Sequence, residues 1–221
     1  MTDPDLPTTT ADPALAGTGS RPGVRLVLWA VLVLAIGALV GALLWQRAAH
    51  EPLPRYDPMP AFTFTDRDGE PFGTGELAGG PWILDFVFTR CPGVCPRMTE
   101  TMAGVEARLP DDPRLRLVSI SVDPDYDTPE RLQAYAETYD APARWHFLTG
   151  PRPRILTLAE ALGLPVNVDP DLPITDPRAI MHSSRFLLID EDGVVRGYYS
   201  SLDQAAMDEL VEDATRLLRG S

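Results

Sequence analysis

Residues 82–98 read WILDFVFTRCPGVCPRM, and this stretch decides the fold. The run 82–88 is short and densely apolar, and it lies between a Gly-Gly-Pro turn and a Cys-Pro pair, which is typical of a buried central strand. Pro96 suits the first position of a following helix, so we expect Cys95 to cap it. That helix is predicted over 96–109 by the spacing of its apolar residues, Met98, Met102, Val105 and Leu109.

Strands and helices alternate along the chain on both sides of this corner. A weak strand at 61–65 precedes it, and further strands are predicted at 115–122, 145–148, 185–190 and 194–199. Helices are predicted from Asp127–Glu130 to about Tyr139, over 152–162 and over 203–219. This order predicts an α/β sandwich with parallel crossovers and an antiparallel hairpin at one edge.

Cys91 and Cys95 are the only cysteines in the chain. Two thiols exclude a multi-disulfide scaffold and any four-thiolate zinc or iron–sulfur site built by one chain. A helix N-terminus favours negative charge, so both thiols should ionise more readily than an isolated cysteine, which serves redox exchange and metal binding alike. Because three residues separate them, both sulfurs can aim at one point. Two thiolates can hold Cu(I), and an imidazole would complete a trigonal site.

His182 is the histidine that the predicted topology brings to this corner. It follows a polar loop at 164–181 and precedes the strand 185–190, whose start can lie beside the strand end that carries the cysteines. We expect His146, which lies inside a strand pattern, to serve packing or capping, and His50 to be exposed to solvent. We expect Met98 and Met102 in the core, although the Met98 thioether could also lie near a bound copper ion.

Three other interpretations of the cysteine pair stay open. A structural role, as a disulfide or as two buried free thiols, is disfavoured because a bridge here would close almost no loop. A thiol–disulfide oxidoreductase or peroxidase of the same fold would use the same two cysteines to exchange electrons. A plain membrane-tethered interaction domain would need neither cysteine.

The N-terminal part of the chain resembles a membrane anchor. The 26–45 segment has no charge and, at ~1.5 Å per residue, reaches ~30 Å, the thickness of a bilayer core. Trp29 and Trp45 lie near its ends, and Arg47 stands where a cleaved signal peptide needs a small residue. We expect a disordered tail at 1–25, an uncleaved transmembrane helix at 26–45, a Pro-rich tether at 46–59 and a folded domain at 60–221. The flanking arginines are balanced and do not orient the helix.

The composition excludes some classes of partner. The 221 residues carry a net charge of −13, and every basic residue is an arginine, so nucleic acid is not an expected partner. A hydrophobic content of 44% excludes disorder of the whole chain.

Four segments together resemble the Sco/SenC family of copper chaperones: DFVFTRCPGVCPRM, SISVDPDYDTPERLQAYA, FLTG and HSSRFLLIDEDGVVRGYY. The resemblance runs from about Pro60 to the C-terminus. It implies a thioredoxin-like fold, copper binding by Cys91, Cys95 and His182, and redox activity of the cysteine pair. The segment from Asp123 to Glu130 matches a motif that we interpret as structural.

The resemblance also implies a place of action. Such proteins are tethered to a bacterial cytoplasmic or mitochondrial inner membrane and deliver copper to the dinuclear centre of cytochrome c oxidase subunit II. Some reduce the cysteines of that subunit. We therefore expect a metallochaperone rather than an enzyme, held in the bacterial cytoplasmic membrane by one helix, with its domain on the periplasmic side. Met181 and Gly93 stand where the family commonly has acidic or polar residues, so the surroundings of the imidazole can differ.

Overall fold

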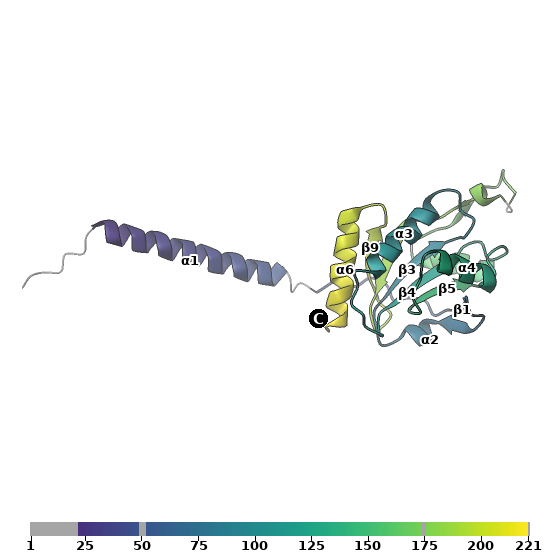
Figure 1. Ribbon diagram of the computed structural model, residues 1–221, viewed down its shortest axis with the longest axis horizontal. Helices are drawn as coiled ribbons and strands as arrows, with labels where there is room; N and C mark the ends of the chain where they lie inside the picture. Colours follow the sequence, from purple (N-terminus) through teal and green to yellow (C-terminus); the bar gives the residue numbers. More distant parts are fainter. Residues whose placement is uncertain (1–21, 49–51, 174–175, 221) are drawn as a thin grey trace, which may run out of the picture. The chain divides into compact units, whose positions relative to one another are not determined.

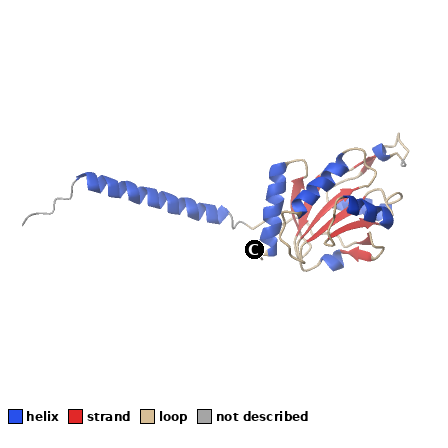
Figure 2. Cartoon of the chain, in the orientation of Figure 1, coloured by secondary structure: helices blue, strands red, loops and turns tan. Residues whose placement is uncertain are grey.

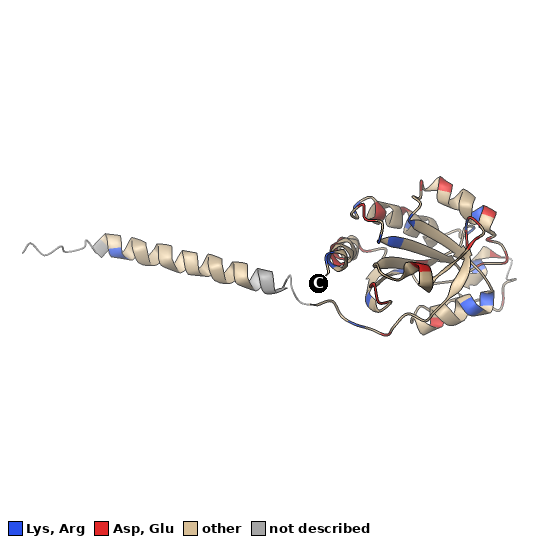
Figure 3. Ribbon diagram, turned by 90° about the horizontal axis from the view of Figure 1, so that it is seen from below, with Lys and Arg blue, Asp and Glu red and all other residues tan. Residues whose placement is uncertain are grey.

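The computed structural model describes residues 22–48, 52–173 and 176–220. The chain divides into two compact units, Met1–Glu51 and Pro52–Ser221. In the first, helix α1 (Pro22–Ala48) is longer at both ends than the predicted 26–45 segment. Its segment Gly23–Leu43 is long and apolar enough to cross a membrane, and α1 is almost uncharged along its described length (Figures 1 and 3). The predicted tail lies outside the described residues, apart from its last four, which are helical.

The second unit is a seven-stranded mixed sheet with helices on both faces (Figures 1 and 2). The strand order across the sheet is β2-β1-β5-β4-β3-β8-β9. The strands are β1 (Thr63–Asp66), β2 (Pro71–Gly73), β3 (Trp82–Val87), β4 (Arg116–Ser121), β5 (Trp145–Thr149), β8 (Arg185–Ile189) and β9 (Val195–Ser200). The helices are α2 (Thr74–Leu77), α3 (Val94–Glu106), α4 (Pro129–Thr138), α5 (Arg152–Ala161) and α6 (Gln204–Leu218).

The densely apolar run after Pro81 forms the strand at the heart of the sheet. All six residues of β3 are buried. It pairs parallel with β4 on one side and antiparallel with β8 on the other. This confirms the predicted α/β sandwich, because the parallel strands are joined by helices and the antiparallel hairpin β8–β9 closes one edge.

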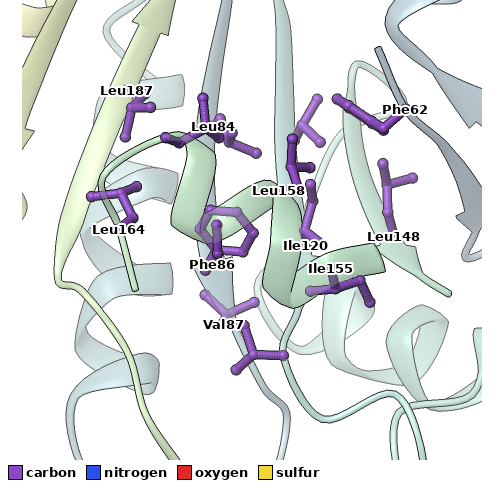
Figure 4. Close-up of a cluster of buried hydrophobic side chains, with 14 of the residues drawn as sticks. Phe62, Leu84, Phe86, Val87, Ile120, Leu148, Ile155, Leu158, Leu164 and Leu187 are labelled. Atoms are coloured by element: carbon purple, nitrogen blue, oxygen red, sulfur yellow. The ribbon is translucent and has the colours of Figure 1, made fainter. Parts of the chain in front are cut away.

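Two hydrophobic clusters cover the two faces of the sheet. One packs α5 against β3 and β4 through residues such as Leu84, Ile120 and Ile155 (Figure 4). The other packs α3, α4 and α6 against the opposite face and contains Met98 and Met102, both fully buried. The prediction that these two methionines belong to the core is therefore confirmed.

Helix α3 begins two residues earlier than predicted. Gly93 is the residue before its first turn, so Cys95 lies inside the helix and does not cap it. The expectation for Cys95 was wrong because a proline can occupy any first-turn position, where no N–H has a partner within the helix. Cys95 thus belongs to a rigid element, whereas Cys91 lies in the loop before it.

Several short elements were not predicted. Strand β2 and helix α2 lie between β1 and β3, and β6 (Asn167–Val168) pairs with β7 (Ile180–Met181) across the polar loop, next to a short turn of helix at Pro177–Ala179. Elements of two to four residues carry too little hydrophobic pattern to be recognised.

Residues 52–59, predicted to belong to the tether, pack against the domain. Leu53 is buried in the cluster that contains α6, and Pro58 forms a bridge with Val194 at the start of β9. The proline-rich composition indicates an extended chain but does not reveal whether that chain packs on a surface.

At Gly80, just before β3, the chain passes close to the backbone of Arg114. A Cβ at this position would lie 2.2 Å from the Arg114 carbonyl oxygen. We expect Gly80→Ala to lower the free energy of unfolding by about 1–3 kcal/mol, because backbone must move to admit the methyl group. Urea denaturation measures the change.

Gly104 supplies the matched control, because it lies within α3 with no atom within 4 Å of an added Cβ. We expect Gly104→Ala to raise the free energy of unfolding by about 0.5–1 kcal/mol. Equal effects of the two substitutions would contradict the close contact at Gly80.

Candidate metal centre

The structure brings Cys91, Cys95 and His182 together. Their ligand atoms all lie within 4.8 Å of one another, and the Cys95 Sγ is 2.8 Å from the His182 Nε2. Cys91 lies in the loop after β3, Cys95 in the first turn of α3, and His182 just before β8. Since β8 runs antiparallel to β3, its start lies beside the end of β3, which explains how residues distant in the sequence meet.

The His182 ring is oriented by its own backbone. Nδ1 lies 3.0 Å from the Ser183 carbonyl oxygen, which can only accept, so Nδ1 is the donor in this contact and Nε2 is the nitrogen that faces the cysteines. The edge of the ring packs against Phe88, with centroids 5.7 Å apart. Met181, where an acidic residue is common in the family, is exposed. The Ser183 backbone carbonyl, rather than an acidic side chain, therefore orients the imidazole.

The two thiols have opposite electrostatic surroundings. The pKa of Cys91 is lowered to about 4, first by the hydrogen bond from Cys95 and further by His182 and by the backbone N–H groups of Cys95 and Gly93. The pKa of Cys95 is raised, first by burial and then by the neighbouring Cys91. Both cysteines are free. At neutral pH the site therefore holds a half-buried thiolate at Cys91 and a buried thiol at Cys95.

An aspartate in the loop between β4 and α4 holds the segment that leads to Cys91. Asp127 is fully buried, and its carboxylate accepts hydrogen bonds from the Thr89 backbone N–H at 3.1 Å and from the hydroxyls of Thr89 and Ser121. This explains the Asp127–Glu130 match as structural, because the carboxylate connects the β4–α4 loop to the chain just before the cysteines.

A second aspartate of the same loop holds the next residue. Asp123 accepts a hydrogen bond from Arg90 at 2.6 Å, and Arg152 also contacts it at 3.2 Å. Arg90 further packs over the Tyr126 ring. Residues 89 and 90 are thus held from one side by a single loop.

Asp85 is a functional candidate that the sequence reasoning missed. This residue of β3 has no exposed surface, and burial is the main cause that raises its pKa to about 7. The Ser119 hydroxyl donates to one oxygen at 2.6 Å, and within the described residues the other oxygen has no hydrogen-bond partner. The signal in the sequence is an acid in the middle of the apolar run WILDFVF.

The remaining histidines play no part in this cluster. His146 stacks on Phe72 with centroids 3.8 Å apart and pairs with Asp66 at 2.6 Å, which confirms its packing role. His50 lies outside the described residues. Among the residues the structure describes, Cys91, Cys95 and His182 form the one group of three metal-ligating side chains.

The fold and the site define a thioredoxin-like domain with a candidate Cys–Cys–His metal centre at the end of its central strand. The SCO1/SenC family model matches residues 51–219, and the chain therefore belongs to the SCO1/SenC family.

Similar proteins agree with this assignment. A Stutzerimonas stutzeri protein, provisionally named a copper-binding protein, is 34% identical over 179 residues, covering 76% of this chain and 84% of its own. A SCO1/SenC family lipoprotein from Bacillus anthracis matches with a TM-score of 0.64 at 34% identity, over 72% of this chain and 94% of its own. BsSco is described as containing a disulfide switch and as a member of the Sco family of cytochrome c oxidase assembly proteins. Its structure matches with a TM-score of 0.65 at 27% identity, over 77% of this chain and 98% of its own.

The ionisation of Cys91 can be measured by its alkylation. The rate follows the thiolate fraction, so we expect half-maximal alkylation near the pKa of about 4, a tenfold fall per pH unit below it, and a plateau at neutral pH. Cys95→Ala removes the main stabilising donor and should move the midpoint to higher pH. A midpoint near the usual ~8.5 in the unaltered protein would contradict the described geometry.

The Asp127 contacts can be tested by their effect on stability. Asp127→Ala leaves three donors without their acceptor, so we expect the free energy of unfolding to fall by about 3 kcal/mol, with faster hydrogen exchange at Thr89. The control is Asp125→Ala, whose side chain is 74% exposed and pairs with Arg152, and we expect a change of about 1 kcal/mol or less. Equal losses would show that Asp127 has no special part in holding the loop.

Proposed function

We propose that this chain is a membrane-anchored copper metallochaperone in which Cys91, Cys95 and His182 hold the ion. The observation that carries the proposal is the convergence of two sulfurs and one imidazole nitrogen within 4.8 Å. The chemistry of this donor set favours copper. Thiolates are soft ligands that select Cu(I), and an imidazole suits copper as well. The Stutzerimonas stutzeri relative is itself provisionally named for copper binding.

The protonation states also favour loading. A metal ion must displace protons from its ligands, and Cys91 is already a thiolate at neutral pH because its pKa is about 4. His182 directs Nε2, the nitrogen that is not bonded to Ser183, at the two sulfurs.

Delivery follows from the unequal exposure of the ligands. Cys91 and His182 are half-buried, whereas Cys95 is fully buried. An incoming donor from a partner can reach the ion on the Cys91 side and replace the ligands one after another. We propose the dinuclear copper centre of cytochrome c oxidase subunit II as the acceptor, in keeping with the description of BsSco as a cytochrome c oxidase assembly protein.

We place the protein in the bacterial cytoplasmic membrane. The apolar segment Gly23–Leu43 of α1 would span the bilayer, and the Bacillus anthracis relative is described as a lipoprotein. The domain would lie on the periplasmic side, where the copper centre of an oxidase subunit is accessible.

A second candidate function is the reduction of a partner disulfide, and the unequal thiols favour it. The Cys91 thiolate would attack the partner disulfide, forming a mixed disulfide and releasing one partner sulfur as a thiolate. Cys95 would then attack the Cys91 sulfur and release the second partner sulfur, which takes up the Cys95 proton. Two electrons pass to the partner, and the Cys91–Cys95 disulfide remains. BsSco is described as containing a disulfide switch. Rapid reduction of a disulfide by metal-free protein that persists in His182→Ala would support this function.

The copper site is tested by loading the reduced protein with Cu(I) and recording X-ray absorption. We expect one ion per chain with two sulfur ligands and one nitrogen ligand. His182→Ala should lose the nitrogen and at least tenfold in affinity. His146→Ala is the matched control, because His146 pairs with Asp66 outside the cluster, and it should keep both. Unchanged coordination in His182→Ala would refute the three-ligand site.

A further inference from the structure

Residues 53–59, called the strap below, lie as an extra strand-like segment along β9. The Tyr56 N–H donates to the Val195 carbonyl at 2.9 Å, the Met59 N–H donates to the Gly193 carbonyl at 2.7 Å, and the Val195 N–H donates to the Asp57 carbonyl at 3.3 Å. The Tyr56 ring meets Tyr198 edge-on at 5.3 Å. The strap is therefore part of the folded domain.

Arg196 fastens the start of the strap. Its Nε and Nη2 donate to the carbonyl oxygens of Pro54 and Leu53 at 2.7 and 2.8 Å, and its Nη1 contacts Asp190 at 2.9 Å. The Arg196 side chain is only 9% exposed. Its planar fork matches two successive carbonyls, which a lysine could not do.

Leu53 provides an apolar contact at the same point. Its side chain is 7% exposed and packs in the cluster that includes Tyr199, Met207 and Leu210. Burial of this leucine side chain is favourable and adds to the backbone hydrogen bonds. The strap is thus fastened at its first residue by both polar and apolar contacts.

The strap sets how much chain is free between α1 and the domain. Helix α1 ends at Ala48, so four residues, 49–52, separate it from Leu53, the first residue of the strap. At roughly 3.5 Å per residue, the distance from Ala48 to Leu53 is at most about 18 Å. Releasing the seven residues of the strap would add about 25 Å.

We propose that the strap, locked by Arg196, is a reach-limiting device that keeps the Cys91–Cys95–His182 site close to the membrane surface. The proposal rests on the membrane anchoring of α1 proposed above. A short link raises the effective concentration of the domain towards acceptors held in the same membrane, and a longer link dilutes it. The device therefore favours membrane-bound acceptors over freely diffusing ones.

Docking of the strap is tested by hydrogen exchange on the full chain in phosphatidylcholine–phosphatidylglycerol vesicles. In Arg196→Gln we expect at least tenfold faster exchange at Tyr56 and Met59 and unchanged exchange in β3 and β4. Arg185→Gln, at an exposed arginine of β8, is the control and should change neither.

A second variant tests docking of the strap without changing the buried Arg196. Tyr56 is 49% exposed, and Tyr56→Pro removes the N–H that donates to Val195. Asp57→Pro is its matched control, because Asp57 takes part through its carbonyl, which proline retains. We expect Tyr56→Pro to speed exchange at Met59 and Asp57→Pro to leave it unchanged.

The distance between the domain and the membrane is measured by energy transfer from a dye on the domain to labelled lipid headgroups. The dye is attached at Gln133→Cys in a Cys91→Ser/Cys95→Ser background. We expect lower transfer, with a broader distance distribution, in Arg196→Gln and Tyr56→Pro than in their controls. Equal transfer despite faster exchange would refute the reach-limiting role, and unchanged exchange would refute the lock. Failure of the chain to sediment with vesicles would refute the anchor instead, and the exchange data would still decide whether the strap is docked.

Discussion

The antiparallel pairing of β3 with β8 is the constraint on which the candidate site depends. In register, Leu84 faces Leu187, so the end of β3 and the start of β8 lie at the same edge of the sheet. A parallel neighbour would place its own end there, and a residue before that strand would lie at the opposite edge. The reversed direction of β8 therefore brings His182 to the two cysteines, although 87 positions of sequence separate it from Cys95.

The two thiols differ in burial, and this difference gives them different protonation states. Cys95 lies inside the first turn of α3 and has no exposed surface, so its charged form is disfavoured and it acts as a donor. Cys91 lies in the loop, where it receives that hydrogen bond together with backbone N–H groups, and its pKa falls to about 4. A helix N-terminus alone would have lowered both pKa values. The difference arises from desolvation, which exceeds the dipole effect at the buried position.

Long periodic segments and one dense apolar run were enough to predict the sheet, its main helices and the meeting of the cysteines with His182. Two predictions that were based on prolines were wrong or incomplete. Pro96 suits several first-turn positions, so it did not locate the start of α3, and the prolines at 54 and 58 indicated an extended chain without showing that it packs on β9. The surroundings of Asp85 could not be predicted from the sequence, because they include the Ser119 hydroxyl of the neighbouring strand β4. Such cross-strand contacts follow from register, which a single sequence does not specify.

Contacts from several elements hold the chain around the candidate site. Asp127 and Asp123 hold residues 89 and 90, α3 holds Cys95, and the strap holds the far edge of the sheet at β9. Cys91 and His182 are half-buried. In the proposed copper transfer, a partner would meet a sulfur and a nitrogen whose flanking chain is already held in place, so less ordering entropy would be lost in forming a shared-ligand complex. Release of the ion would then depend on how strongly the partner's donors compete with Cys91, since the buried Cys95 would be the last ligand to leave.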